Sequence, residues 1–268
     1  MILENTDNCF EGVVLLRDSS FSLEGKLAVI TGARRGVGQG IAVAFAKAGA
    51  DVVSIHQAGE CDETARLVGQ YDRKCYGISC DLSTLNDAEP LAAEIESKYG
   101  PVGILVNNAG IQRRHPAAEF PVSDWDLVVQ VHLRATFLLC QAFGRRMLTR
   151  GSGKIINMAS LISFSGGVYI PAYAASKGGI AQLTKAFANE WASRGINVNA
   201  IAPGYIDTEM NTALINDPVR NPQIMARIPA GRWGQSEDIG GPAVFLASSA
   251  ADYVHGHILL VDGGWMSR

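Results

Sequence analysis

The chain has 268 residues, of which 47% are hydrophobic and 18% are charged, a balance that excludes a disordered protein. Its formal net charge of −3 argues against nucleic-acid binding, because that function needs a basic surface. No apolar run approaches the about 20 residues needed to span a bilayer, so no membrane partner is expected. The five cysteines form no CxxC pair, which favours reduced thiols in a cytoplasmic protein over disulfides or a metal site.

Residues 1–20 are polar and irregular, and we interpret them as an N-terminal extension to one domain over residues 21–268. Seven short runs follow, each with the nearly continuous apolar character of a strand buried on both faces. These predicted strands span residues 27–30, 51–55, 75–79, 103–106, 154–158, 196–201 and 257–261. Predicted helices span residues 38–47, 87–98, 123–150, 173–193 and 236–248. The alternation predicts a single-domain α/β fold, a doubly wound parallel seven-stranded sheet with helices on both faces.

Residues 208–233 interrupt this alternation with a polar segment that contains Asn211, Asn216 and Pro218. The segment follows the sixth predicted strand, at the carboxyl edge of the sheet, where doubly wound folds bind ligands. We therefore expect a substrate lid near residues 208–233, the alternative being a surface excursion with no functional role. Its apolar side chains would suit an apolar ligand or could equally form its own packing face: Met210, Leu214, Ile215 and Met225.

The turn after the first predicted strand reads TGARRGVG over residues 31–38. Between a strand and a helix, a glycine-rich turn lets backbone N–H groups and the helix N-terminus face a pyrophosphate. The pattern predicts that Gly32, Gly36 and Gly38 hold a dinucleotide, with a plain tight turn as the alternative.

Tyr173 and Lys177 stand four residues apart in a predicted helix, and therefore on one helix face. A neighbouring ammonium favours the phenolate, so the pKa of Tyr173 is expected to fall from about 10 toward neutrality. Such a tyrosine can exchange a proton with a substrate alcohol or carbonyl. Ser160 follows the fifth predicted strand, where its hydroxyl could bond the same substrate oxygen, which favours this interpretation over a simple surface pair.

Five motifs in this order and spacing resemble the short-chain dehydrogenase/reductase family over roughly residues 22–268. They are TGARRGVG, Asn107-Asn108-Ala109-Gly110, Ser160 thirteen positions before Tyr173, the YAASK string that ends at Lys177, and Pro203-Gly204-Tyr205-Ile206-Asp207-Thr208. The resemblance implies a Rossmann-type fold and hydride transfer between a nicotinamide and a carbonyl or secondary alcohol. It also implies a homotetramer, with a dimer as the next expectation.

By this resemblance, Tyr173 is the expected acid/base, Lys177 holds the nicotinamide ribose, and Ser160 anchors the substrate oxygen. Asp81 resembles the adenine contact, and Ile206 and Thr208 resemble the segment that holds the carboxamide. The turn and the resemblance together predict these cofactor-binding residues: Gly32, Arg34, Arg35, Gly36, Val37, Gly38, His56, Asp81, Leu82, Asn108, Ala109, Gly110, Tyr173, Lys177, Pro203, Gly204, Ile206 and Thr208.

One position departs from the family pattern. The family usually has asparagine in a Val-Asn-Leu setting after the fourth strand, where it keeps a water-linked proton path from the lysine. This chain has Val131-His132-Leu133 there. Imidazole can also relay protons, so His132 could be a catalytic substitute; a slower enzyme and a protein without redox activity are the alternatives.

A second departure concerns the choice of cofactor. Family members that prefer NAD usually carry an acid at the end of the second strand, where this chain has His56-Gln57. Glu60 and Asp62 follow shortly, whereas Arg34 and Arg35 could meet a 2′-phosphate or simply be solvated. We therefore favour NADP(H) slightly over NAD(H).

Within that family the sequence resembles the group of 2-deoxy-gluconate 3-dehydrogenases and 2-dehydro-3-deoxy-gluconate 5-dehydrogenases. The likeness includes FSLEGK over residues 21–26, GIQRR over 110–114, IPAGRWG over 228–234 and VDGGW over 261–265. It implies a sugar-acid substrate, with Tyr205 near it and with Arg113 or Arg114 able to clamp the carboxylate. Surface solvation or a subunit contact is the alternative for these two arginines. A reductase of bulkier ketones and a dinucleotide-binding protein without catalysis are the alternatives.

Overall fold

The structure is a computed structural model that describes residues 19–57 and 61–268. The predicted N-terminal extension therefore lies outside the described residues except for Ser19 and Ser20, which open the short 3-10 turn Ser19–Phe21. Glu60, considered above for cofactor choice, also lies outside them.

Seven parallel strands form one sheet, as the alternation predicts, and their order is β3-β2-β1-β4-β5-β6-β7. The strands differ from the predicted ranges by at most two residues at an end. They are β1 (Leu27–Thr31), β2 (Asp51–His56), β3 (Cys75–Ser79), β4 (Ile104–Asn107), β5 (Gly153–Met158), β6 (Ile196–Pro203) and β7 (Ile258–Val261).

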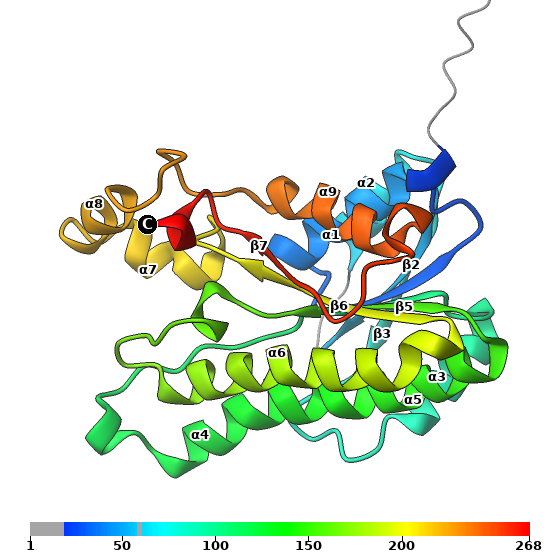
Figure 1. Ribbon diagram of the computed structural model, residues 1–268, viewed down its shortest axis with the longest axis horizontal. Helices are drawn as coiled ribbons and strands as arrows, with labels where there is room; N and C mark the ends of the chain where they lie inside the picture. The colour runs from blue at the N-terminus through cyan, green and yellow to red at the C-terminus, as the bar shows by residue number, and fades with distance from the viewer. Residues whose placement is uncertain (1–18, 58–60) are drawn as a thin grey trace, which may run out of the picture.

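Helices cover both faces of this sheet (Figure 1). One layer holds α1 (Gly36–Lys47), α2 (Asp62–Gly69) and α9 (Ser236–Ala247). The other holds α3 (Glu89–Tyr99), α4 (Val122–Val129), α5 (Ala135–Arg150) and α6 (Pro171–Trp191). The strand β1 shows why both faces are apolar: Leu27 and Val29 enter one core, and Ala28 and Ile30 enter the other.

Outside the interval 208–233, a helix and a π-helical turn were not predicted. The helix α2 was missed because it is short and polar, with one fully buried apolar side chain, Val68. The predicted helix 123–150 is continuous but contains a π-helical turn, η3 (Gln130–Arg134), between α4 and α5. Among the described residues, the stretch Val122–Arg150 is long and apolar enough to span a membrane by length and composition alone, yet 56% of its most apolar window is buried, as in a core helix.

The strand order reverses between β1 and β4, which are neighbours in the sheet although α1, α2 and α3 separate them in the chain. In doubly wound folds the crevice at such a switch point, outside the carboxyl ends of the strands, is where ligands bind. The turns after β1 and β4 carry the glycine-rich motif and the Asn107-Asn108-Ala109-Gly110 motif.

The interval 208–233 contains two short helices, α7 (Thr212–Ile215) and α8 (Arg220–Met225), which lie beyond the sheet near the C-terminus (Figure 1). Their apolar side chains pack with Trp265, three residues before the end of the chain, in a separate small core. Leu214, Ile215 and Met225 belong to that core, so they supply the packing face of this segment.

Candidate active site

A cleft of about 930 Å³ opens at the carboxyl ends of the strands, around the switch point. All eighteen positions expected to contact the cofactor line this cleft. The sequence motifs therefore converge on one cleft although they are spread over most of the chain.

The floor of the cleft is built by a close approach of the first two motifs. Asn108 donates its side-chain amide to the carbonyl oxygens of Thr31 (2.9 Å) and Gly32 (3.3 Å). A Cβ on Gly38 would lie 2.4 Å from the Gly32 oxygen, so no other residue fits there. Gly32 itself has a positive φ of 69°. This leaves the N-terminus of α1 open to the cleft, the geometry that suits a pyrophosphate.

The catalytic candidates meet beside β5. Ser160 follows that strand, is 6% exposed, and accepts a hydrogen bond at 3.2 Å from the Ile162 N–H, which fixes its hydroxyl. Tyr173 lies in the first turn of α6, where the Ser160 hydroxyl lowers its pKa. One turn later, the Lys177 ammonium lies 5.6 Å from the Tyr173 ring centre and donates to the Met158 carbonyl at 2.5 Å.

The pKa of Tyr173 differs from the expectation. Burial raises it above its ordinary value, while the Ser160 hydroxyl and the charge of Arg114 pull it down. Lys177 does not supply the expected lowering, because burial drops the pKa of Lys177 itself to about 7 and so weakens its charge near neutral pH. In this protein the tyrosine hydroxyl is protonated at neutral pH, as an acid that donates to a carbonyl must be.

His132 lines the same cleft and is 1% exposed. Its Nε2 accepts a hydrogen bond from the Ile111 N–H at 2.8 Å and lies 2.9 Å from the Ile111 carbonyl oxygen. Its ring packs edge-on against Tyr173, with 5.4 Å between ring centres. Burial, with help from the charge of Lys177, lowers the pKa of His132 to about 3, so the ring is neutral at physiological pH.

The two arginines of the GIQRR segment differ in their partners. Arg113 lines the cleft, but its guanidinium lies 3.3 Å from Asp124, which also bonds His115 at 2.7 Å. Arg114 is exposed and makes no hydrogen bond or ion pair with any residue that the structure describes. Its charge nevertheless reaches the hydroxyl of Tyr173 and lowers its pKa.

Tyr205 is not among the residues that line the cleft. Its ring packs against Trp233 and Trp265, with ring centres 5.3 Å and 4.7 Å away. The segment after it does reach the cleft, through three residues of the expected lid that were not among the predicted cofactor contacts: Glu209, Met210 and Asn211. Their position after the cofactor motif that ends at Thr208 was the available signal.

The outer end of the cleft carries both basic and acidic side chains. Arg34 and Arg35 line it, and Arg35 forms an ion pair with Glu209 from the opposite wall. Gln57, which was not predicted, donates to Asp81 at 3.0 Å and links the ends of β2 and β3.

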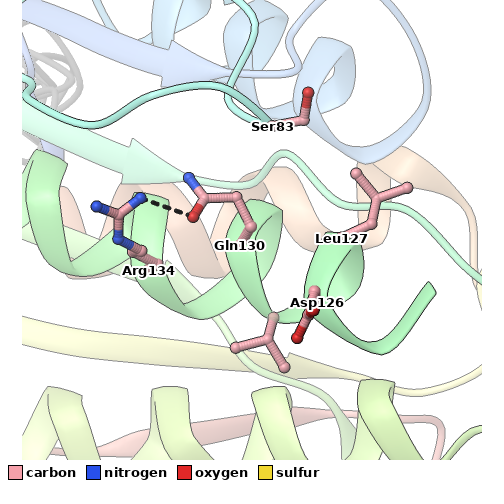
Figure 2. A pocket seen from close by; sticks show the side chains of 6 residues that line it. Ser83, Asp126, Leu127, Gln130 and Arg134 are labelled. Atoms are coloured by element: carbon pink, nitrogen blue, oxygen red, sulfur yellow. Dashed lines mark hydrogen bonds between the residues drawn. The ribbon is translucent and has the colours of Figure 1, made fainter. Parts of the chain in front are cut away.

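A second, shallower pocket of about 470 Å³ adjoins the cleft and shares Ser83 and Leu127 with it. Figure 2 shows Arg134 and Gln130 side by side on one helix that lines the pocket. The Arg134 guanidinium donates a hydrogen bond of 2.9 Å to the Gln130 side-chain oxygen. Gln130 also donates to backbone carbonyls of the segment after β3. The pocket therefore lies where the π-helical turn packs against that segment.

Comparison with known proteins agrees with this geometry. A family model described as enoyl-(acyl carrier protein) reductase matches residues 32–266. A 2-dehydro-3-deoxy-D-gluconate 5-dehydrogenase of Bacillus subtilis is 54% identical over 93% of this chain and 98% of its own length. The enzyme of that name from Escherichia coli is 47% identical over 93% of this chain and 99% of its own length.

Among solved structures, a gluconate 5-dehydrogenase of Burkholderia cenocepacia in complex with NADP and tartrate is 40% identical. The match has a TM-score of 0.88 and covers 93% of this chain and 98% of that one. Fold, motifs and cleft therefore agree with the sequence similarity: the chain belongs to the short-chain dehydrogenase/reductase family of NAD(P)-dependent oxidoreductases.

Proposed function

We propose that this oxidoreductase acts on a keto-deoxy sugar acid or on the hydroxy acid that corresponds to it. The relatives named above carry names of this substrate class, and the structure from Burkholderia cenocepacia binds tartrate, a hydroxy acid. The observation that carries the proposal is the exposed guanidinium of Arg114, which has no ion-pair partner among the described residues and whose charge lowers the pKa of Tyr173.

Arg114 rather than Arg113 is the carboxylate clamp in this proposal. Arg113 already has a carboxylate partner in Asp124, so binding a second carboxylate would require it to share or release the first. Arg114 has no such competitor within the described part of the chain, and a guanidinium binds a carboxylate with two parallel hydrogen bonds. A substrate held there would present its carbon–oxygen group toward Tyr173.

The proposed chemistry uses three side chains. A bound nicotinamide dinucleotide supplies or accepts the hydride. In the direction of reduction, the Tyr173 hydroxyl gives its proton to the carbonyl oxygen, and the Ser160 hydroxyl bonds the same oxygen. Lys177 holds its Nζ between the Met158 carbonyl and the tyrosine ring, where it would meet the nicotinamide ribose. In oxidation the same proton returns to Tyr173.

We propose NADP(H) as the preferred cofactor. No acid stands at the end of β2, and two arginines of the glycine-rich turn line the outer end of the cleft, where a 2′-phosphate would lie. The NADP in the Burkholderia cenocepacia relative supports this proposal.

A homotetramer and a cytoplasmic location complete the proposal. Large apolar side chains stay exposed on one protomer, among them Trp125 and Phe137 on the long helix and Leu260 on the edge strand β7. The four described cysteines are free thiols, as in a reducing compartment. Light scattering at a known concentration would distinguish a tetramer from a dimer.

The test is oxidation of NADPH, and separately of NADH, followed at the nicotinamide absorbance with a panel of keto-deoxy sugar acids and bulky uncharged ketones. We expect turnover of a sugar acid with a higher kcat/KM for NADPH. Turnover of the bulky ketones alone would overturn the substrate proposal. Tight cofactor binding without turnover of either class would instead indicate a protein that binds dinucleotide without catalysis.

A further inference from the structure

Ser163 ends the 3-10 turn η4 (Leu161–Ser163), which follows β5 and begins directly after Ser160. It is not among the predicted site residues, and it does not line the cleft. Its hydroxyl nevertheless joins the backbones of two residues of the proposed chemistry. It accepts a hydrogen bond from the Ser160 N–H at 3.2 Å and donates one to the Lys177 carbonyl at 2.7 Å.

The turn η4 holds Ser160 in a reciprocal arrangement of side chains and backbone, a capping box. The Ser163 N–H donates to the Ser160 carbonyl at 2.8 Å, and the Ser160 hydroxyl accepts from the Ile162 N–H at 3.2 Å. The Ser160 oxygen therefore uses one acceptor position within its own turn. Its O–H and its second lone pair remain for a substrate oxygen and for Tyr173.

The two hydrogen bonds of the Ser163 hydroxyl have a fixed direction. A carbonyl oxygen only accepts, so the hydroxyl must donate to Lys177, and an N–H only donates, so the same oxygen must accept from Ser160. The chain of bonds runs from the Ser160 N–H through Ser163 to the Lys177 carbonyl. Bonds in such a chain polarise and strengthen one another.

Lys177 is held at both of its ends by the segment that follows β5. Its Nζ donates to the Met158 carbonyl at 2.5 Å, and its own carbonyl accepts from Ser163. Met158 and Ser163 stand on either side of Ser160 in the sequence, and Tyr173 lies one turn before Lys177 in α6. A shift of α6 along this segment would break these bonds, so they control how far Tyr173 lies from Ser160.

Two nearby serines show what a purely local hydroxyl looks like. Ser165 donates to the Leu161 carbonyl at 3.3 Å and stays within its own loop. Ser176 donates to the Tyr173 carbonyl at 2.9 Å and stays within its own helix. The bond from Ser163 to Lys177 instead connects two elements, across 14 residues of sequence. Capping of η4 therefore explains one of the two bonds of Ser163 and leaves the other unexplained.

We propose that Ser163 is a positioning residue, whose hydroxyl sets the spacing between Ser160 and the pair Tyr173 and Lys177. It acts through the backbones of Ser160 and Lys177, touches neither substrate nor cofactor, and transfers no proton. The inference rests on the proposed function, because it assigns Ser163 a part in the same reaction.

The experiment compares three variants with the wild-type enzyme, using NADPH and whichever carbonyl compound the wild type reduces. Ser163→Ala removes the hydroxyl, and Ser163→Thr keeps it. Ser165→Ala is the matched control, since it removes a hydroxyl from the same loop that bonds only within that loop. For each variant, kcat, KM, the Kd for NADPH and the unfolding midpoint are measured. The kinetic isotope effect on kcat is measured with NADPH that carries deuterium at the transferred position.

We expect Ser163→Ala to lower kcat about 10- to 100-fold, the effect of slightly misplaced reacting groups, while KM and the Kd for NADPH stay within about threefold of wild type. Its isotope effect should be at least as large as that of the wild type, because the slower step is the hydride transfer itself. Ser163→Thr should recover most of the loss, and Ser165→Ala should leave kcat unchanged. If Ser163→Ala does not fold, Ser163→Cys, which keeps a weak donor and acceptor, takes its place.

Four results would overturn the inference. Ser163→Ala with a kcat close to wild type would show that the hydroxyl is dispensable. A Ser163→Thr variant as slow as Ser163→Ala would show that the hydroxyl is not the group that matters. An equal loss in Ser165→Ala would assign the effect to the loop as a whole. A lower kcat with a smaller isotope effect would place the defect outside the chemical step.

The substrate proposal is tested separately by the wild type. If the wild type turns over no sugar acid but does reduce another ketone, the substrate proposal fails, and the comparison of the Ser163 variants still stands with that ketone.

Discussion

The two sides of the cleft are built in different ways. On the cofactor side, Asn108 and Gly38 bring two backbone turns into contact, so the shape is set by main-chain atoms. On the substrate side, the charge comes from exposed side chains such as Arg113, which lines the cleft, and Arg114, which does not. The first side can be predicted from a motif. The substrate side depends on which side chains form ion pairs with each other, and a sequence motif does not predict those pairs.

The largest expected effect lies where the two sides meet. Tyr173→Phe removes the proton donor and should lower kcat about 100- to 10,000-fold. The fold and the Kd for NADPH should be retained, because the ring still packs against His132. Steady-state kinetics and a binding titration on the same sample separate the two quantities. If the Tyr173→Phe variant kept nearly full activity, Tyr173 would not be the proton donor. If the variant lost activity but kept the biological role of the protein, a non-enzymatic function would be favoured.

The two arginines sharpen the substrate side. Arg114→Ala should lower kcat/KM for a sugar acid about 10- to 100-fold, because a charged hydrogen bond to the carboxylate is lost. Arg113→Ala is the matched control and should have a much smaller effect, since Asp124 already occupies that guanidinium. A neutral ketone should not distinguish the two variants.

Arg114→Ala should also move the pH profile. Its charge lowers the pKa of Tyr173, so its loss should raise the pKa that the kcat/KM profile reports, and Arg114→Lys should restore part of the shift. Equal losses in Arg113→Ala and Arg114→Ala would contradict the distinction between them.

On the cofactor side, Arg35→Ala should raise the KM for NADPH about 10-fold and leave that for NADH unchanged, because only NADPH carries the 2′-phosphate. Glu209→Gln is the control: it removes the partner of Arg35 and should leave NADPH binding unchanged or tighter. If Arg35→Ala raised the KM for NADPH and the KM for NADH equally, Arg35 would not bind the 2′-phosphate.

The smallest expected effect is on stability. The pKa of His132 is about 3 in the folded chain and 6.5 in its ordinary state, so the unfolded chain binds the extra proton between these values. Above pH 6.5 the difference in proton binding at His132 therefore has no effect on the free energy of unfolding. As the pH falls toward 3, this difference lowers the free energy of unfolding of the wild type. At pH 5 it should cost the wild type about 2 kcal/mol relative to His132→Asn, measured by urea unfolding at pH 7 and pH 5. If the free energy of unfolding changed equally with pH in the wild type and in His132→Asn, the His132 ring would not be buried in its neutral form.

The sequence was sufficient for the strands because each reads as an apolar run, and it located Ser160, Tyr173 and Lys177 because their spacing follows from the fold. The sequence did not predict α2, because that helix is short and mostly polar and shows no clear helical repeat of apolar residues. It did not predict the π-helical turn either, because the apolar pattern of the long helix continues through it. It also predicted a lowered pKa for Tyr173. Proximity of an ammonium can be read from a four-residue spacing, but the burial that outweighs it depends on the whole fold.

The amide of Asn108 joins the turn after β4 to the turn after β1, across 76 and 77 residues of sequence. Neither half of the sheet can therefore form the cofactor site by itself, and the unfolded chain has no weaker version of it. A ligand that binds only the folded state stabilises it in proportion to the logarithm of its concentration over Kd. The concentration of dinucleotide in the cell therefore shifts the folding equilibrium toward the folded state. The half-life of the protein should increase with the concentration of its cofactor.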